Sequence, residues 1–200
     1  MTSTAPQRYP TAWPQWCGRP WLGANGTAAM QTLLAQGGDH LVDYLKVGPF
    51  MGREMVASLA NRYPLLLHLD DTLSRQRLPQ EDIDRLCDWA ALTGTPWTSE
   101  HIGFGVANVN LDEALITQPA TDLLSREEAL DHIVRNAREL ARQLLVPLLL
   151  ENVPLFPNFA HITVCEPEFI SEVIAATGCD LLLDLAHAGV SADVLGYEVR

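Results

Sequence analysis

Three short blocks of consecutive apolar residues constrain the fold of this chain more than any other feature. They read LLLH at 65–68, PLLLEN at 147–152 and LLLDLA at 181–186. A strand with one face in solvent alternates apolar and polar residues, whereas continuous blocks are typical of parallel strands buried on both faces. Similar short apolar runs predict six strands in all, at 21–24, 44–47, 65–69, 97–101, 146–152 and 179–185.

Helical signals lie between the predicted strands. Ser125 and Glu128 form an S-x-x-E capping box ahead of an apolar stripe at helical spacing. Two further helices begin at a proline and end at a glycine, over 79–94 and 167–178. Shorter helices are expected at 27–36 and 52–62. A strand and a helix thus alternate six times, which predicts an α/β fold with right-handed crossovers.

The distribution of polar groups favours a TIM (β/α) barrel over an open doubly wound sheet, because candidate functional residues follow several different strands. A nucleotide-binding open sheet would carry a glycine-rich phosphate turn after an early strand, and no such motif is present. We assign 1–20, with its four prolines, to an irregular N-terminal arm and 21–200 to a partial barrel domain. Six βα units cannot close a barrel of eight, so the first and sixth strands are expected to be open edges.

Charge and composition exclude several classes of partner. The chain has 13 Lys plus Arg against 25 Asp plus Glu, a formal charge of −12, which argues against nucleic-acid binding and against docking on anionic membranes. It has no apolar run of about 18 residues and no apolar signal-peptide core. Its four cysteines form no C-x-x-C pair. We therefore expect a cytoplasmic protein with reduced thiols.

Histidine, carboxylate and amide side chains follow four consecutive predicted strands. They are His68, Glu100, His101, Glu151, Asn152, Asp184 and His187. The carboxyl ends of parallel strands meet at one rim, and imidazoles and carboxylates that converge there call for a cation. Mixed nitrogen and oxygen ligands suit iron, manganese, zinc or cobalt better than calcium or magnesium. The sequence therefore predicts a transition-metal site at this rim.

Strand alternation limits which of these side chains point inward. Neighbouring residues face opposite sides, so we place His101 and Glu151 inward, with Glu100 and Asn152 behind them or presented by a turn. Structural alternatives stay open: His68 could bond a loop carbonyl, and Glu151 or Asp184 could cap a turn or helix. His132 lies on the polar face of its helix and is expected to be solvated.

Longer segments around these residues resemble a known family, the multinuclear non-haem iron-dependent oxidative enzymes that include the methanobactin-maturation oxidase. The family is similar to the xylose-isomerase-like TIM barrels. The resemblance runs from about Leu22 to the end of the chain and is most specific between Glu151 and Ala192. Its segments are LLLHLDD at 65–71, SEHIGFG at 99–105, DLLSREEALDHIVRNAREL at 122–140, LLLENVPLFPNFA at 148–160 and CEPEFISEVIAATGCDLLLDLAHAGVSA at 165–192.

The resemblance implies an activity and a ligand set. Members bind two or three irons at the barrel mouth and use O₂ to remodel cysteine residues of a ribosomally made peptide, usually with a small partner protein. Carried across by motif, the metal-site positions are His68, His101, Glu151, Asp184 and, where many members have Asn, His187.

Two departures separate this chain from the family pattern. Where members carry a Glu-Asn pair after the second strand, this chain has Gly48 and Pro49, and the nearby cation of Lys46 disfavours a bound metal. The sequence ends at Arg200, whereas members continue through two more strands with further ligands.

We therefore expect at most one tightly bound metal, no peptide oxidation by the isolated chain, and a tendency to oligomerise. The alternatives are another metal-dependent barrel, such as a sugar isomerase, epimerase or endonuclease, and a non-catalytic barrel-derived binding module.

Overall fold

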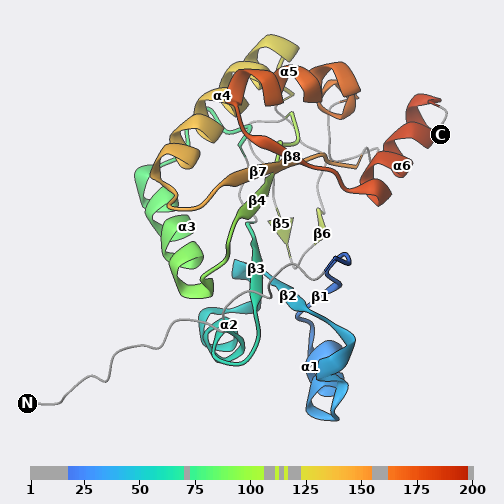
Figure 1. The fold of residues 1–200 in the computed structure, drawn as a ribbon. Helices are drawn as coiled ribbons and strands as arrows, with labels where there is room; N and C mark the ends of the chain where they lie inside the picture. Colours follow the sequence, from blue (N-terminus) through green and yellow to red (C-terminus); the bar gives the residue numbers. More distant parts are fainter. Residues whose placement is uncertain are drawn as a thin grey trace, which may run out of the picture.

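Six parallel strands, each followed by a helix, form the fold (Figure 1). The computed structural model describes residues 18–69, 73–105, 123–154 and 162–197, together with the backbone of 111–112 and 115–116. The strand order is β1-β2-β3-β4-β7-β8, so the chain adds each new strand beside the previous one, as in a TIM barrel. The strands of this sheet are β1 (Gly23–Asn25), β2 (Tyr44–Val47), β3 (Leu65–His68), β4 (Thr98–His101), β7 (Leu148–Glu151) and β8 (Asp180–Leu182).

The helices begin and end close to the positions that the sequence predicts. They are α1 (Ala28–Ala35), α2 (Arg53–Ala60), α3 (Gln80–Thr93), α4 (Arg126–Gln143), α5 (Pro167–Thr177) and α6 (Leu185–Leu195). The capping box of Ser125 and Glu128 forms as predicted. Gly94 and Gly178 end α3 and α5 in the left-handed conformation, which glycine adopts without a Cβ clash. Single 3₁₀ turns occur at Gly38–Leu41, Pro49–Met51 and Ile162–Cys165.

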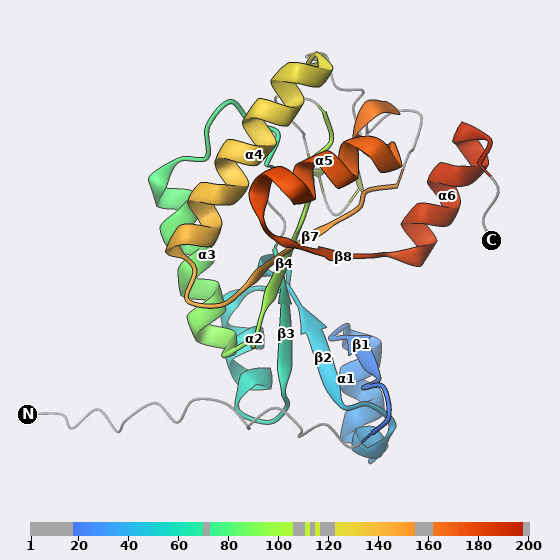
Figure 2. The same cartoon turned by 45° about the horizontal axis from the view of Figure 1, so that its top comes forward.

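The two faces of the sheet have different roles. Residues paired across parallel strands share a face, and the pairing groups the fully buried Leu45, Leu67 and Leu150 on the face that the helices cover. Figure 2 shows α3, α4 and α5 along that outer side of the curved sheet. The strand residues between these leucines therefore point to the opposite, inner face, where the polar side chains gather.

The described part of the sheet does not close into a barrel. Strands β1 and β8 have a neighbour on one side only, which confirms the incomplete barrel predicted from six βα units. The predicted arm over 1–20 lies outside the described residues except for its last three. Within the described ranges, no helix combines the length and the apolarity that a membrane crossing needs.

Three details differ from the sequence prediction. Strand β8 ends at Leu182, before the predicted 185, because Asp184 caps α6 instead of continuing the strand. A two-residue hairpin, β5 (Leu111–Asp112) with β6 (Leu115–Ile116), lies between β4 and α4, and such short strands have no recognisable periodicity. His132 is half-buried rather than solvated: its Nδ1 lies 3.1 Å from the carbonyl oxygen of Ser74, because the loop after β3 folds against α4.

Leucines on the β8 side of the sheet predict self-association. Leu181, Leu183 and Leu185 are 40%, 55% and 75% exposed beside the outer edge of β8, which pairs with no further strand among the described residues. Contiguous apolar surface beside an open edge favours association. We expect size-exclusion chromatography to show oligomers that dissociate on dilution, and Leu185→Glu to shift the protein toward monomer, since an acidic residue suits the first turn of α6. A wild-type chain that elutes as a monomer at every concentration would contradict this prediction.

Candidate metal centre

The carboxyl ends of three adjacent strands deliver two imidazoles and a carboxylate to one point on the inner face. His68 ends β3, His101 ends β4 and Glu151 ends β7. His101 pairs with Glu151, and His68 pairs with Ser99, two residues before His101, so all three side chains share a face. One potential ligand atom from each lies within 4.8 Å of the others.

A second group of ligand atoms adjoins the first and shares Glu151 with it. Glu151, Asp184 and His187 also place one ligand atom each within 4.8 Å of one another. Asp184 caps α6, its Oδ1 accepting from the backbone N–H of His187 at 2.8 Å. That cap fixes the first turn of α6 and leaves Oδ2 of Asp184 at 3.7 Å from Nε2 of His187. All five predicted ligands therefore lie in one cluster around Glu151.

The two strand histidines are held as neutral rings. Burial, reinforced by the charges of neighbouring histidines and Lys46, lowers the pKa of His68 to about 2. Burial likewise lowers the pKa of His101 to about 4, with His187 and Lys46 acting in the same direction. Nδ1 of His68 lies 2.9 Å from Oγ of Ser99 and 3.4 Å from Oε2 of Glu151. Because His68 is neutral, the contact with Ser99 is the real hydrogen bond, and the longer one is no salt bridge.

Glu151 is the least satisfied group of the cluster. Its side chain is 2% exposed, and its buried Oε2 has no hydrogen-bond partner among the described residues. Burial raises the pKa of this carboxyl group, although Lys46 and His187 act against that shift. An unpaired buried acceptor costs about 1–3 kcal/mol, more when charged. A cation at the cluster would bind this oxygen and both neutral imidazoles, so the residues present fit a metal ion.

Asn152 orients the second group of ligands. Its side-chain amide accepts from the backbone N–H of Asp184 at 2.7 Å and donates to the carbonyl of Asp184 at 3.0 Å. Its own carbonyl oxygen lies 2.9 Å from Nδ1 of His187. A histidine that donates from Nδ1 presents Nε2 as a ligand atom, which is the usual arrangement behind metal-bound histidines.

Glu100 faces away from the cluster. It pairs with Leu150, so it lies on the helix-covered face of β4, where it is fully buried. Its Oε1 accepts from the backbone N–H of His101 at 2.8 Å. Glu100 thus contacts the neighbouring ligand candidate through the main chain.

Ser99 is a functional candidate that the sequence analysis did not select. It is buried on the same face as His68 and His101, and its hydroxyl holds the ring of His68. A lone serine within a strand has no distinguishing pattern. Only the register of β3 against β4 identifies it.

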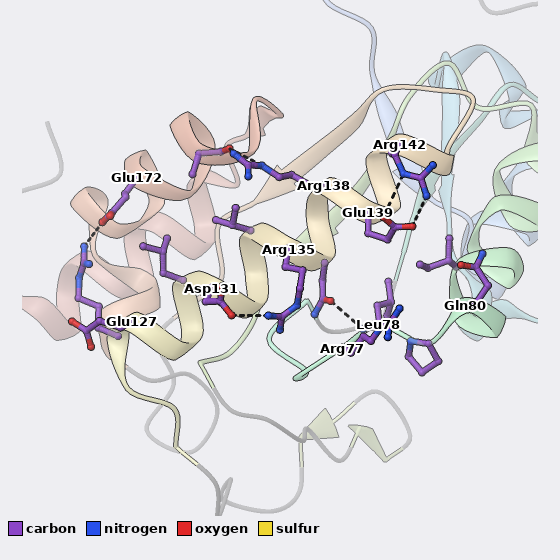
Figure 3. Close-up of a pocket in the computed structure, with 17 residues that line it drawn as sticks. Arg77, Leu78, Gln80, Glu127, Asp131, Arg135, Arg138, Glu139, Arg142 and Glu172 are labelled. Atoms are coloured by element: carbon purple, nitrogen blue, oxygen red, sulfur yellow. Dashed lines mark hydrogen bonds and ion pairs between the residues drawn. The ribbon is translucent and has the colours of Figure 1, made fainter.

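A groove of about 1410 Å³ follows the outer face of α4, away from the rim (Figure 3). Six of its charged side chains form ion pairs, Arg126 with Glu172, Arg135 with Asp131, and Arg142 with Glu139. None of the described residues that line the groove is a histidine or cysteine. One of these pairs joins α4 to α5, and the other two lie within α4. We therefore take the rim cluster, and not this groove, as the candidate site.

Comparisons with known proteins identify a matching family and relatives of this chain. Residues 42–200 match the family described as RiPP precursor modification enzyme MbnB/TglH/ChrH, where RiPP denotes a ribosomally made, modified peptide. A UPF0276 protein of Caulobacter vibrioides is 32% identical over 168 residues, which cover 79% of this chain and 58% of the relative. One of Paraburkholderia phytofirmans is 29% identical over 163 residues, 80% of this chain and 51% of the relative. The chain thus spans between half and three fifths of these relatives' length.

Among solved structures, the fold is similar to the IOLI protein with a bound zinc atom. The TM-score is 0.53 at 14% identity, over 84% of this chain and 64% of that one. Other similar structures are xylose-isomerase-like TIM barrels, such as one from Mycobacterium smegmatis in complex with magnesium, with a TM-score of 0.47 at 15% identity over 82% of this chain and 64% of that one. At 14% identity the likeness to the IOLI protein concerns the fold alone. The strand order of the sheet is that of an α/β barrel type, as predicted.

Proposed function

Because the chain belongs to the MbnB/TglH/ChrH family of RiPP precursor modification enzymes, we propose that it is a metal-dependent enzyme acting on cysteine residues of a ribosomally made precursor peptide. The observation that supports this most strongly is Glu151, whose buried Oε2 lacks a hydrogen-bond partner at the junction of two ligand groups. A small partner protein that presents the peptide is part of the proposal.

Iron is the metal we propose, held by His68, His101 and Glu151. Two histidines and one carboxylate with positions left open are the ligand set of many non-haem Fe(II) enzymes that use O₂. Bound iron would supply O₂ activation and would lower the pKa of a cysteine thiol that binds it. Asp184 and His187 complete the site from the side of β8.

The residues of the chain have separate tasks in this proposal. His68 and His101 are neutral at pH 7, so they bind a cation without first releasing a proton. Ser99 and Asn152 hold ligand rings in place through hydrogen bonds. The leucines under the rim keep water from the helix side of the site.

We expect one tightly bound transition-metal ion per chain. Both ligand groups use Glu151, and the positive charge of Lys46 opposes a second cation on the β2 side. Elemental analysis after anaerobic loading with Fe(II) and desalting measures the number bound. Mössbauer spectra of iron-57-loaded protein should show a single uncoupled species. An antiferromagnetically coupled pair would contradict the count.

The function itself is tested with peptide. The metal-loaded protein is incubated under air with a cysteine-containing precursor peptide, with and without a small partner protein, and the peptide mass is followed. A mass change that requires iron supports the proposal, and it would overturn the expectation from the sequence that the isolated chain does not oxidise a peptide. Metal uptake without any change of the peptide mass would contradict the proposal and would favour the alternative of a non-catalytic binding module.

A further inference from the structure

Lys46 is the only lysine of the chain, and β2 places it on the inner face of the sheet, next to the metal centre. It pairs with Leu66, two residues before His68 on β3, so its side chain shares the face of the ligands. Neighbouring strands lie about 5 Å apart, so an extended lysine reaches toward the rim. The positive charge of Lys46 also lowers the pKa of His68, His101 and Glu151, which is consistent with its place near these side chains.

Within the part of the chain that the structure describes, the ammonium group of Lys46 has no counter-ion. The side chain is half-buried, and among the described residues no carboxylate forms an ion pair with it and no acceptor hydrogen-bonds to it. Its neighbours on β1 and β3 in the same register are Asn25 and Leu66, both uncharged. A partly buried charge is costly unless it is paired. Among the described residues, Lys46 is therefore a partly buried positive charge beside the site that takes part in no structural salt bridge.

Charge balance identifies what it could pair with. A divalent metal brings two positive charges to the rim, and Lys46 adds a third, against two carboxylates, Glu151 and Asp184. Glu151 and a cysteine thiolate on the metal would balance the two charges of the metal. Asp184 caps α6 on the β8 side, so among the described residues Lys46 on the β2 side would still lack an anionic partner. The anionic groups that a peptide carries at neutral pH, apart from a thiolate, are carboxylates.

We propose that Lys46 binds a carboxylate group of the peptide substrate, so that the modified cysteine lies next to a carboxylate in the peptide. This inference rests on the proposed function. The carboxylate belongs either to the C-terminus of the peptide or to an Asp or Glu beside the cysteine. Lys46 donates to this group from the β2 side of the rim, while the ligands from β3, β4 and β7 face the cysteine.

A single lysine makes the test direct. Protein produced with [¹³C,¹⁵N]-lysine carries the label at residue 46 alone, and its side-chain NMR signals report contacts of that group. The protein is examined metal-free and loaded with zinc, which is diamagnetic, and zinc uptake is measured separately by equilibrium dialysis. The probes are N-acetylcysteine and N-acetylcysteine amide, which differ only in the carboxylate. An amidated N-acetyl-Cys-Asp dipeptide places the carboxylate on a side chain instead.

We expect N-acetylcysteine or the Asp dipeptide to shift the Lys46 signals, and the amide to leave them unchanged. Whichever acid binds tighter identifies the source of the carboxylate. Loss of a charge-assisted hydrogen bond corresponds to roughly a tenfold to hundredfold weaker Kd. Lys46→Met should show that loss for the acid and less than about a twofold change for the amide. Lys46→Arg keeps the charge and should retain most of the affinity.

Arg142→Met serves as the control, since it removes one positive charge from an exposed ion pair on α4. Equal binding of acid and amide by the wild-type protein, or equal losses in Lys46→Met and Arg142→Met, would overturn the proposal. If Lys46→Met does not fold, the comparison of acid with amide on the wild type decides alone. Failure of zinc uptake counts against the metal centre of the proposed function, whereas a carboxylate-dependent shift in metal-free protein would still support Lys46 as the binding group.

Discussion

Glu151→Gln should abolish tight metal binding and at the same time make the metal-free protein more stable. Glu151 is the ligand that both groups share, so its replacement weakens either mode of coordination. Changes of residues that only orient ligands cost about 10–100-fold in metal affinity, so loss of the central carboxylate should exceed about a hundredfold. Equilibrium dialysis against zinc or anaerobic Fe(II), with elemental analysis, measures the affinity.

The expected gain in stability has a separate origin. Without metal, Glu151 keeps a carboxyl group in a site where burial disfavours its charged form and leaves Oε2 unpaired. Glutamine fills the same space without a charge, which should add about 1 kcal/mol to the free energy of unfolding. For a domain of this size that corresponds to a Tm higher by roughly 2–4 °C. Thermal unfolding in the presence of a chelator measures it.

Asp88→Asn is the matched control, because it removes the same charge from an exposed position on α3. An exposed substitution of this kind is expected to stay within about 0.5 kcal/mol and to leave metal affinity unchanged. If Glu151→Gln bound metal as tightly as the wild type, the centre would have to lie elsewhere. If the Glu151→Gln protein lost both metal affinity and stability, Glu151 would be a residue that stabilises the fold. It would then not be a ligand whose burial lowers the free energy of unfolding.

The strands and helices were predictable because their signals are local. Continuous leucine blocks identify β3 and β7, and a capping box identifies the start of α4. The end of β8 was not predictable, since an aspartate after leucines can continue a strand or cap a helix. Here the hydrogen bonds of Asn152 to the backbone of Asp184 favour the cap.

The site was predictable as a set of residues but not as an arrangement. Strand ends placed His68, His101 and Glu151 at one rim, and alternation required Glu100 and His101 to face opposite ways. The sequence analysis placed His101 inward, and the register of β4 against β7 agrees, because it pairs His101 with Glu151 and Glu100 with Leu150. Ser99 likewise could be identified only from the register. Lys46 gained its proposed role only because no described residue acts as its counter-ion.

Acidification should destabilise the metal-free protein well above the pH at which its carboxylates titrate. Folding holds the pKa of His68 at about 2 and that of His101 at about 4, against 6.5 for a free side chain. Below pH 6.5 these two histidines therefore bind protons in the unfolded chain but stay neutral in the folded chain. The free energy of unfolding consequently falls as the pH falls. The contribution is complete above pH 6.5 and is lost progressively toward pH 4 and, for His68, toward pH 2.

The raised pKa of Glu151 acts in the opposite direction, because its folded form keeps a proton that the unfolded chain releases above about pH 4.5. Two histidines outweigh one carboxyl group, so we expect a net loss of roughly 2–4 kcal/mol between pH 7 and pH 5. Urea unfolding at a series of pH values in chelator measures this loss.

His68→Leu should weaken the dependence of the free energy of unfolding on pH, since leucine fits beside Leu66 on the same face. His40→Gln, at an exposed position, should leave that dependence unchanged. A stability that stays constant or rises between pH 7 and pH 5 would mean that these imidazoles are protonated in the folded protein, and a cluster that already holds protons would have little affinity for a metal ion.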